Sequence, residues 1–187
     1  MELAVIAEQV QGASALLHPN GTLPSGAVRA VGDMRHRAIR SRQTLEIRLA
    51  RSGVHSTDPR LIYQAASEMV ELVRRVARVV RCRDYLRSGS PPAAVRDLEA
   101  IASRGVQLVA EHARELARSG RARRSPDGVK SLMVPAEELY HRGIAGVFNE
   151  ALDPLEIFRL HALYDVLLAV VVCCEKALKA LRDASVE

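Results

Sequence analysis

Tryptophan is absent from this chain of 187 residues, and aromatic residues make up only 3% of it. Proteins that bind single-stranded nucleic acids usually carry several aromatic side chains on which successive bases stack. This sequence offers no such set of stacking residues. Any binding of a nucleic acid is therefore expected to depend on the charge of the phosphate backbone.

Cysteine is also scarce, with an odd count of three residues, two of them adjacent. Cys82, Cys173 and Cys174 fit neither the framework of a secreted disulfide protein nor the paired spacing of a zinc site. We expect them to be buried, reduced thiols.

Long hydrophobic runs are scarce as well, and we expect no signal peptide. The longest apolar run, residues 166–174, is about half of the roughly 20 residues that a membrane-spanning helix needs. The opening residues Met1-Glu2-Leu3 do not begin a basic signal peptide. We expect a cytoplasmic protein, which can lie against the inner face of the membrane. The 48% of hydrophobic residues is enough to form a sizeable core.

Recognisable catalytic motifs are missing too. None of the six histidines belongs to an H-E-x-x-H pair, a serine elbow or a C-x-x-C group. Gly26, Gly32 and Gly53 are not followed by the Gly-Lys-Ser/Thr of a phosphate-binding loop. The sequence predicts a protein that is not an enzyme and that carries no cofactor. A redox or metal enzyme built on the remaining glutamates and histidines is the weaker alternative.

Arginine is abundant, and it carries almost all of the positive charge behind the net charge of +5. Lysine occurs only at Lys130, Lys176 and Lys179. The arginine side chain suits forked contacts to phosphate and carboxylate groups. The composition therefore favours anionic partners, with a merely solvated, arginine-rich surface as the alternative.

Two similar hexamers, Asp58-Pro59-Arg60-Leu61-Ile62-Tyr63 and Asp153-Pro154-Leu155-Glu156-Ile157-Phe158, lie about half the chain apart. An Asp N-cap accepts the free N–H groups of the first helical turn, and Pro suits the first helical position. Each hexamer therefore begins a helix, and the chain has the pattern of a doubled helical unit.

The remaining signals predict an all-α chain without strands. Helices are expected over residues 2–17, 27–50, 58–87, 90–119, 130–149 and 153–183, and the fifth can begin anew at Pro135. A basic loop, residues 121–124, is the main linker. We expect one domain over residues 1–187, a six-helix antiparallel bundle built as two three-helix halves, about 1–88 and 89–187.

The last helix pair carries A-E-E-L-Y-H-R at residues 136–142, then Val147-Phe148, Asp153-Pro154-Leu155-Glu156-Ile157 and Tyr164. It resembles the PhoU-like family of helical phosphate-transport regulators, in particular the branch encoded beside Pit-type inorganic phosphate transporters. Members read roughly E-A-D-x-I-Y-R, L-F and D-P-L-E-V-I there. The resemblance covers nearly the whole chain and implies the same three-plus-three bundle.

The resemblance also implies metal sites, because E/D-x-x-x-D motifs of the family hold clusters of metal ions, commonly iron. The matching positions here have mostly lost their carboxylates. They carry Arg35, Ile39, Met133, Val70, Arg74, Leu168 and Val172. Glu71, Glu137 and Glu175 are remnants, at most one carboxylate per motif, so we expect no metal cluster.

Leu168 and Val172 extend an apolar run into a helix that is apolar on most of its faces. We expect this face to form a contact between copies of the chain in a homo-oligomer. Deeper packing within one chain is the alternative.

Five arginines are the candidates for binding an anion or a partner: Arg35, Arg37, Arg40, Arg42 and Arg74. Arg35 and Arg74 stand where the family has acids, and they could instead form ion pairs within the chain, for example with Glu71.

The resemblance implies an accessory or regulatory protein of inorganic phosphate transport. Its expected partner is a Pit-type phosphate transporter or a phosphate-signalling protein, which it would meet on the cytoplasmic side of the membrane. The alternative function is that of a basic helical module for a polyanion, such as polyphosphate or a nucleic-acid backbone.

Overall fold

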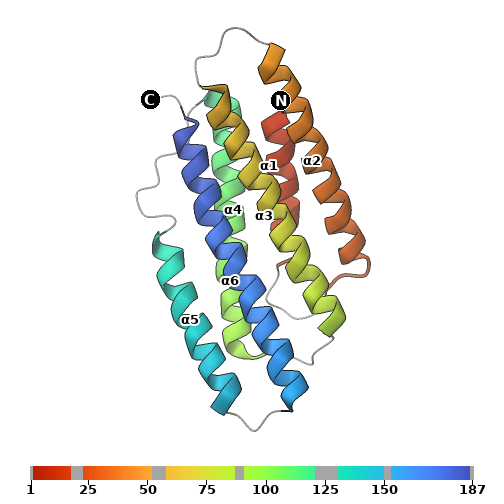
Figure 1. Ribbon diagram of the computed structural model, residues 1–187, viewed down its shortest axis with the longest axis vertical. Coiled ribbons are helices and arrows are strands. Elements are labelled where there is room, and N and C mark those ends of the chain that lie inside the picture. The colour runs from red at the N-terminus through yellow and green to blue at the C-terminus, as the bar shows by residue number, and fades with distance from the viewer. Residues whose placement is uncertain are drawn as a thin grey trace.

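A computed structural model describes residues 2–17, 23–51, 58–86, 91–120, 130–149 and 153–185. Within these ranges the chain is helical and has no strand, which confirms the expectation of an all-α protein (Figure 1). The helices are α1 (Glu2–Ser14), α2 (Ala27–Arg51), α3 (Pro59–Leu86), α4 (Ala93–Ser119), α5 (Lys130–Asn149) and α6 (Pro154–Asp183). The basic loop at 121–124 lies outside the described residues.

Both Asp-Pro helix starts are confirmed. The Asp58 carboxylate accepts a hydrogen bond of 2.9 Å from the Arg60 N–H at the start of α3. The Asp153 carboxylate accepts one of 3.0 Å from the Leu155 N–H at the start of α6. These side chains satisfy amide groups that have no partner inside the helix.

Two helix boundaries differ from the expectation by three residues. The first helix ends at Ser14, and the chain to residue 17 is a turn in which the Leu17 N–H bonds the Ser14 carbonyl. The fourth begins at Ala93, because Pro92 disfavours a helical conformation at the residue before it. The fifth helix has its predicted bounds and passes through Pro135 without a new start.

The six helices lie side by side along the long axis, and successive helices run in opposite directions (Figure 1). Helices α1, α2 and α3 pack against one another, as do α4, α5 and α6. Two further contacts, α1 with α4 and α3 with α6, join these sets. The α3–α6 contact brings together the two helices that begin with Asp-Pro.

Helix α6 is the longest helix of the bundle, with 30 residues. The run 166–174 is too short to cross a membrane, but the whole of α6 is long and apolar enough to do so. Core helices of soluble proteins meet the same criterion. Here α6 packs against α3, α4 and α5, and it buries Tyr164, Leu167 and Leu181. Helix α5 approaches α6 closely because Gly143 has no side chain where the Tyr164 ring lies.

One ion pair is buried inside the bundle. Arg83 of α3 lies with its Nη1 atom 3.2 Å from Oε1 of Glu99 on α4. The Glu99 side chain is 0% exposed and that of Arg83 is 8% exposed. Burial raises the pKa of the Glu99 carboxyl above its ordinary value of 4.5, and the charge of Arg83 opposes this shift.

Candidate functional site

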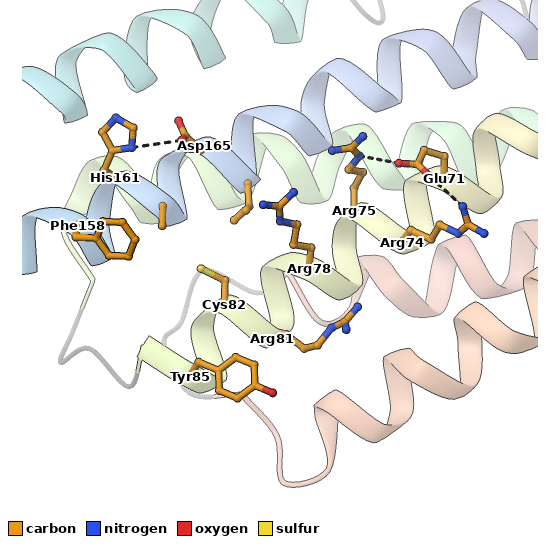
Figure 2. Close-up of a pocket in the computed structure, with 12 residues that line it drawn as sticks. Glu71, Arg74, Arg75, Arg78, Arg81, Cys82, Tyr85, Phe158, His161 and Asp165 are labelled. Carbon is orange, nitrogen blue, oxygen red and sulfur yellow. Dashed lines mark hydrogen bonds and ion pairs between the residues drawn. The ribbon is translucent and has the colours of Figure 1, made fainter. Parts of the chain in front are cut away.

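The outer faces of α3 and α6 enclose an open hollow with a volume of about 830 Å³, which we call the α3–α6 groove (Figure 2). Its polar lining residues are Glu71, Arg74, Arg75, Arg78 and Arg81 from α3 and His161 and Asp165 from α6. Cys82, Tyr85, Phe158, Ala162 and Val166 complete it. The volume of the groove lies in the usual size range of small-molecule sites.

Helical periodicity explains why one helix supplies four arginines to this groove. Arg74, Arg78 and Arg81 are four and three residues apart, so they share a face of α3. Arg75 lies at the edge of the same face, and Figure 2 shows Arg75 and Arg78 reaching from α3 toward α6. The groove therefore holds four arginines against two carboxylates.

Glu71 is engaged by two of these arginines. Its Oε1 atom lies 2.8 Å from Nε of Arg75, and its Oε2 atom lies 3.5 Å from Nη1 of Arg74. Arg81 donates to the Ala77 carbonyl of its own helix at 3.2 Å. Within the described part of the chain, no carboxylate pairs with Arg78 or Arg81, so both guanidinium groups keep their charge available for a ligand.

The carboxylate on the α6 wall is also engaged. Asp165 accepts a hydrogen bond of 2.8 Å from the Tyr140 hydroxyl of α5, and its second oxygen lies 3.3 Å from Nδ1 of His161. The hydrogen bond to Asp165, together with burial and the charge of Asp165, raises the pKa of the Tyr140 hydroxyl. The contact with His161 becomes an ion pair only when the imidazole is protonated.

One end of the groove is aromatic. Tyr85 on α3 and Phe158 on α6 line it, and they are 79% and 69% exposed. Cys82 lies between them and the arginines, and burial raises the pKa of its thiol while Arg78 partly offsets this shift (Figure 2). An exposed aromatic pair beside a row of arginines gives the groove two chemically distinct parts.

The three cysteines are free thiols, in line with the expectation of reduced cysteines. Cys173 and Cys174 are buried, whereas Cys82 is only half-buried. Burial raises the pKa of Cys173 to about 12 and that of Cys174 well above 9.0. The expected burial is therefore correct for the adjacent pair and only partly correct for Cys82.

The predicted interface residues Leu168 and Val172 are half-buried in a second hollow that continues the groove along α6. Glu71, Arg75 and Asp165 line both hollows. The two apolar side chains thus lie beside the charged groove and not in the interior. Their role in an oligomer stays a prediction.

The predicted anion-binding arginines of α2 do not share one site. Arg37 and Arg40 are exposed and line a shallow hollow with Asp33 and His36. Arg42 instead stacks on Tyr63 of α3, with its guanidinium carbon 5.7 Å from the ring centroid. Arg35 is half-buried. Of the five candidates, only Arg74 lines the groove.

The glutamates that match the metal motifs do not come together. Glu71 is held by two arginines, Glu137 is exposed on α5, and Glu175 is half-buried on α6. Among the residues that the structure describes, no three His, Cys, Asp or Glu side chains gather as metal ligands would. The residues at these positions do not fit the hard-cation cluster that the resemblance implies.

Arg75, Arg78, Arg81 and the aromatic pair were not predicted from the sequence. The spacing of Arg74, Arg78 and Arg81 was available as a signal, because it places three charges on one helical face. No comparable signal exists in the sequence for the residues that α6 contributes, because their place in the groove depends on which helices become neighbours.

The chain matches no model of a known protein family and no curated protein.

Proposed function

We propose that this protein is a PhoU-like accessory protein of inorganic phosphate transport, which acts by binding a partner and not by catalysis. The proposed partner is a Pit-type phosphate transporter or a phosphate-signalling protein, reached from the cytoplasmic side. The mutual packing of α1–α3 and of α4–α6 supports a bundle of two three-helix halves.

One observation carries the proposal. Arg74, Leu168 and Val172, at positions where the family would have metal-binding acids, all line the α3–α6 groove or the hollow that continues it. The part of the family's metal-binding surface that falls on α3 and α6 therefore forms one face of this protein, with arginine and apolar side chains in place of acids. Such a face suits a partner segment with both acidic and apolar residues.

Co-purification from the native host tests this proposal. Tagged protein would be recovered from gently solubilised membranes at low and at moderate salt, and the bound proteins would be identified. We expect a phosphate transporter or phosphate-signalling protein with the wild type and its loss with Leu168→Asp, which places a charge on the docking face.

Ile47→Asp is the matched control, because Ile47 is exposed on α2, away from the groove. This variant should recover the same partner as the wild type. Absence of such a partner from the wild-type sample at both salt concentrations would contradict the proposal, as would equal recovery with Leu168→Asp.

The excess of arginine in the groove and the exposed pair Arg37 and Arg40 favour a second candidate, a polyanion-binding module. Binding through phosphate charge releases counterions, so affinity falls steeply with salt. Titration with polyphosphate or duplex DNA at increasing salt would test this candidate. A salt-independent signal, or none at low salt, would exclude it.

A further inference from the structure

The two parts of the α3–α6 groove point to a small molecule with two parts. Arg78 and Arg81 lie along one wall, and Tyr85 and Phe158 lie at the end of the same hollow (Figure 2). A partner surface could use either part alone. One hollow that joins them matches a ligand in which a charged group is attached to a flat ring.

We propose that the α3–α6 groove binds a nucleotide, with its phosphates on Arg78 and Arg81 and its base against Tyr85 and Phe158. This inference goes beyond the proposed accessory role and does not depend on it, because it rests only on the residues of the groove.

The arginines account for the phosphate part. Guanidinium groups present forked donors that match phosphate oxygens, and charged donors of this kind make the stronger hydrogen bonds. Arg78 and Arg81 have no carboxylate partner among the described residues, whereas Arg74 and Arg75 are held by Glu71. From Arg74 to Arg81 the row extends about 10 Å along α3. A row of this length suits a chain of phosphates better than a single phosphate ion.

The acids of the groove do not oppose such a ligand strongly. Glu71 lies between two arginines, and Asp165 accepts the Tyr140 hydroxyl and contacts His161. The charge of Glu71 is therefore offset by two arginines, and one oxygen of Asp165 is already engaged in a hydrogen bond before a ligand arrives. The charge that remains on the wall is positive.

The aromatic pair accounts for the ring. Both members of this pair are more than two-thirds exposed at one end of a hollow, so their rings are accessible to a ligand. Stacking on tyrosine or phenylalanine tolerates any base, because every base has a flat π face. The volume of about 830 Å³ lies within the range of about 300–1,000 Å³ that is usual for small-molecule sites.

Titration calorimetry on the purified full chain tests the proposal, with ATP, GTP, inorganic triphosphate and adenosine as probes. We expect the nucleoside triphosphates to bind more tightly than triphosphate, and adenosine most weakly. Arg78→Gln should weaken the binding of ATP and of triphosphate by roughly 10- to 100-fold, the loss of one charged hydrogen-bonding partner. Tyr85→Ala should weaken the binding of ATP by about fivefold or more and leave the affinity for triphosphate unchanged.

Arg118→Gln is the matched control, because it removes one arginine charge from α4, where Arg118 pairs with Glu115 at 2.8 Å. It should leave all affinities unchanged. Cys82 supplies a second readout, since it is the half-buried thiol inside the groove. Saturating ATP should slow its alkylation in the wild type and in Arg118→Gln.

Two results would overturn the proposal. The first is that no nucleotide binds to the wild type. The second is that triphosphate binds as tightly as ATP and Tyr85→Ala has no effect, which would leave a simple polyanion site. Neither result bears on the recovery of a transporter, so failure here and failure of the accessory role are distinguishable.

Discussion

At the scale of single residues, the buried pair of Arg83 and Glu99 is the most demanding feature of the bundle. Charged side chains lose their hydration when they are buried, and their mutual attraction has to offset that loss. The pair joins α3 to α4 and thus connects helices from the two halves of the sequence. Its energetics can be measured directly by substitution.

Replacing Glu99 by leucine should lower the free energy of unfolding by about 3–5 kcal/mol, because it removes the carboxylate that faces a nearly buried arginine. The double variant Glu99→Leu/Arg83→Met should recover much of this loss, since both charges are then gone. Urea unfolding followed by circular dichroism measures both values. A single variant as stable as the wild type would show that the pair contributes nothing.

The same pair predicts a pH dependence. Burial raises the pKa of Glu99 in the folded state above 4.5, so folding favours the protonated carboxyl. The stabilising contribution of that proton is complete below pH 4.5 and is lost as the pH rises through the folded pKa. The unfolding free energy of the wild type, measured against Glu99→Gln, should therefore fall with rising pH and then level off. A rise over this interval would contradict the shift.

At the scale of helices, local sequence signals predicted the elements well. Caps act within one turn, so Asp58, Asp153 and the left-handed Gly120 mark helix ends without reference to the rest of the fold. The early end of α1 could not be predicted in this way. Leu17 continues the apolar pattern of the helix, but it is buried from the turn that follows Ser14.

The candidate site was only partly predictable for a related reason. The arginines of α2 and α3 are equally plausible on a helical wheel, and only the packing of α6 against α3 gives one row an opposing wall. Phe158 and Tyr85 are far apart in the sequence. They line the same end of the groove only because α3 and α6 pack against each other.

Two glycines of α5 should respond in opposite ways to substitution by alanine. A Cβ atom at Gly143 would overlap the buried Tyr164 ring, whereas one at Gly146 meets no atom within 4 Å. We expect Gly143→Ala to cost about 1–3 kcal/mol of stability. Gly146→Ala should add about 0.5–1 kcal/mol, because alanine favours the helix. Thermal and urea unfolding of both variants measure the difference, and equal effects would contradict the close approach of α5 and α6.

At the scale of the whole molecule, the formation of a homo-oligomer through α6 is still a prediction. Leu168 and Val172 form an apolar strip beside the groove, and burying such a strip gains about 25 cal/mol per Å². If copies of the chain meet there, the double variant Leu168→Asp/Val172→Asp should shift the protein to monomers in light scattering after gel filtration. Ile47→Asp on α2 should not. A wild-type protein that is monomeric at all concentrations would contradict the predicted interface between copies.

The alternating direction of the helices has a practical consequence for any assay. Helix α1 begins and helix α6 ends toward the same end of the bundle, whereas the aromatic end of the groove lies where α3 stops and α6 starts, toward the other end (Figure 1). A surface tether or fluorescent fusion attached beyond the start of α1 or the end of α6 should therefore leave the aromatic end of the groove accessible. Immobilised protein should capture nucleotides or partner segments as readily as protein in free solution.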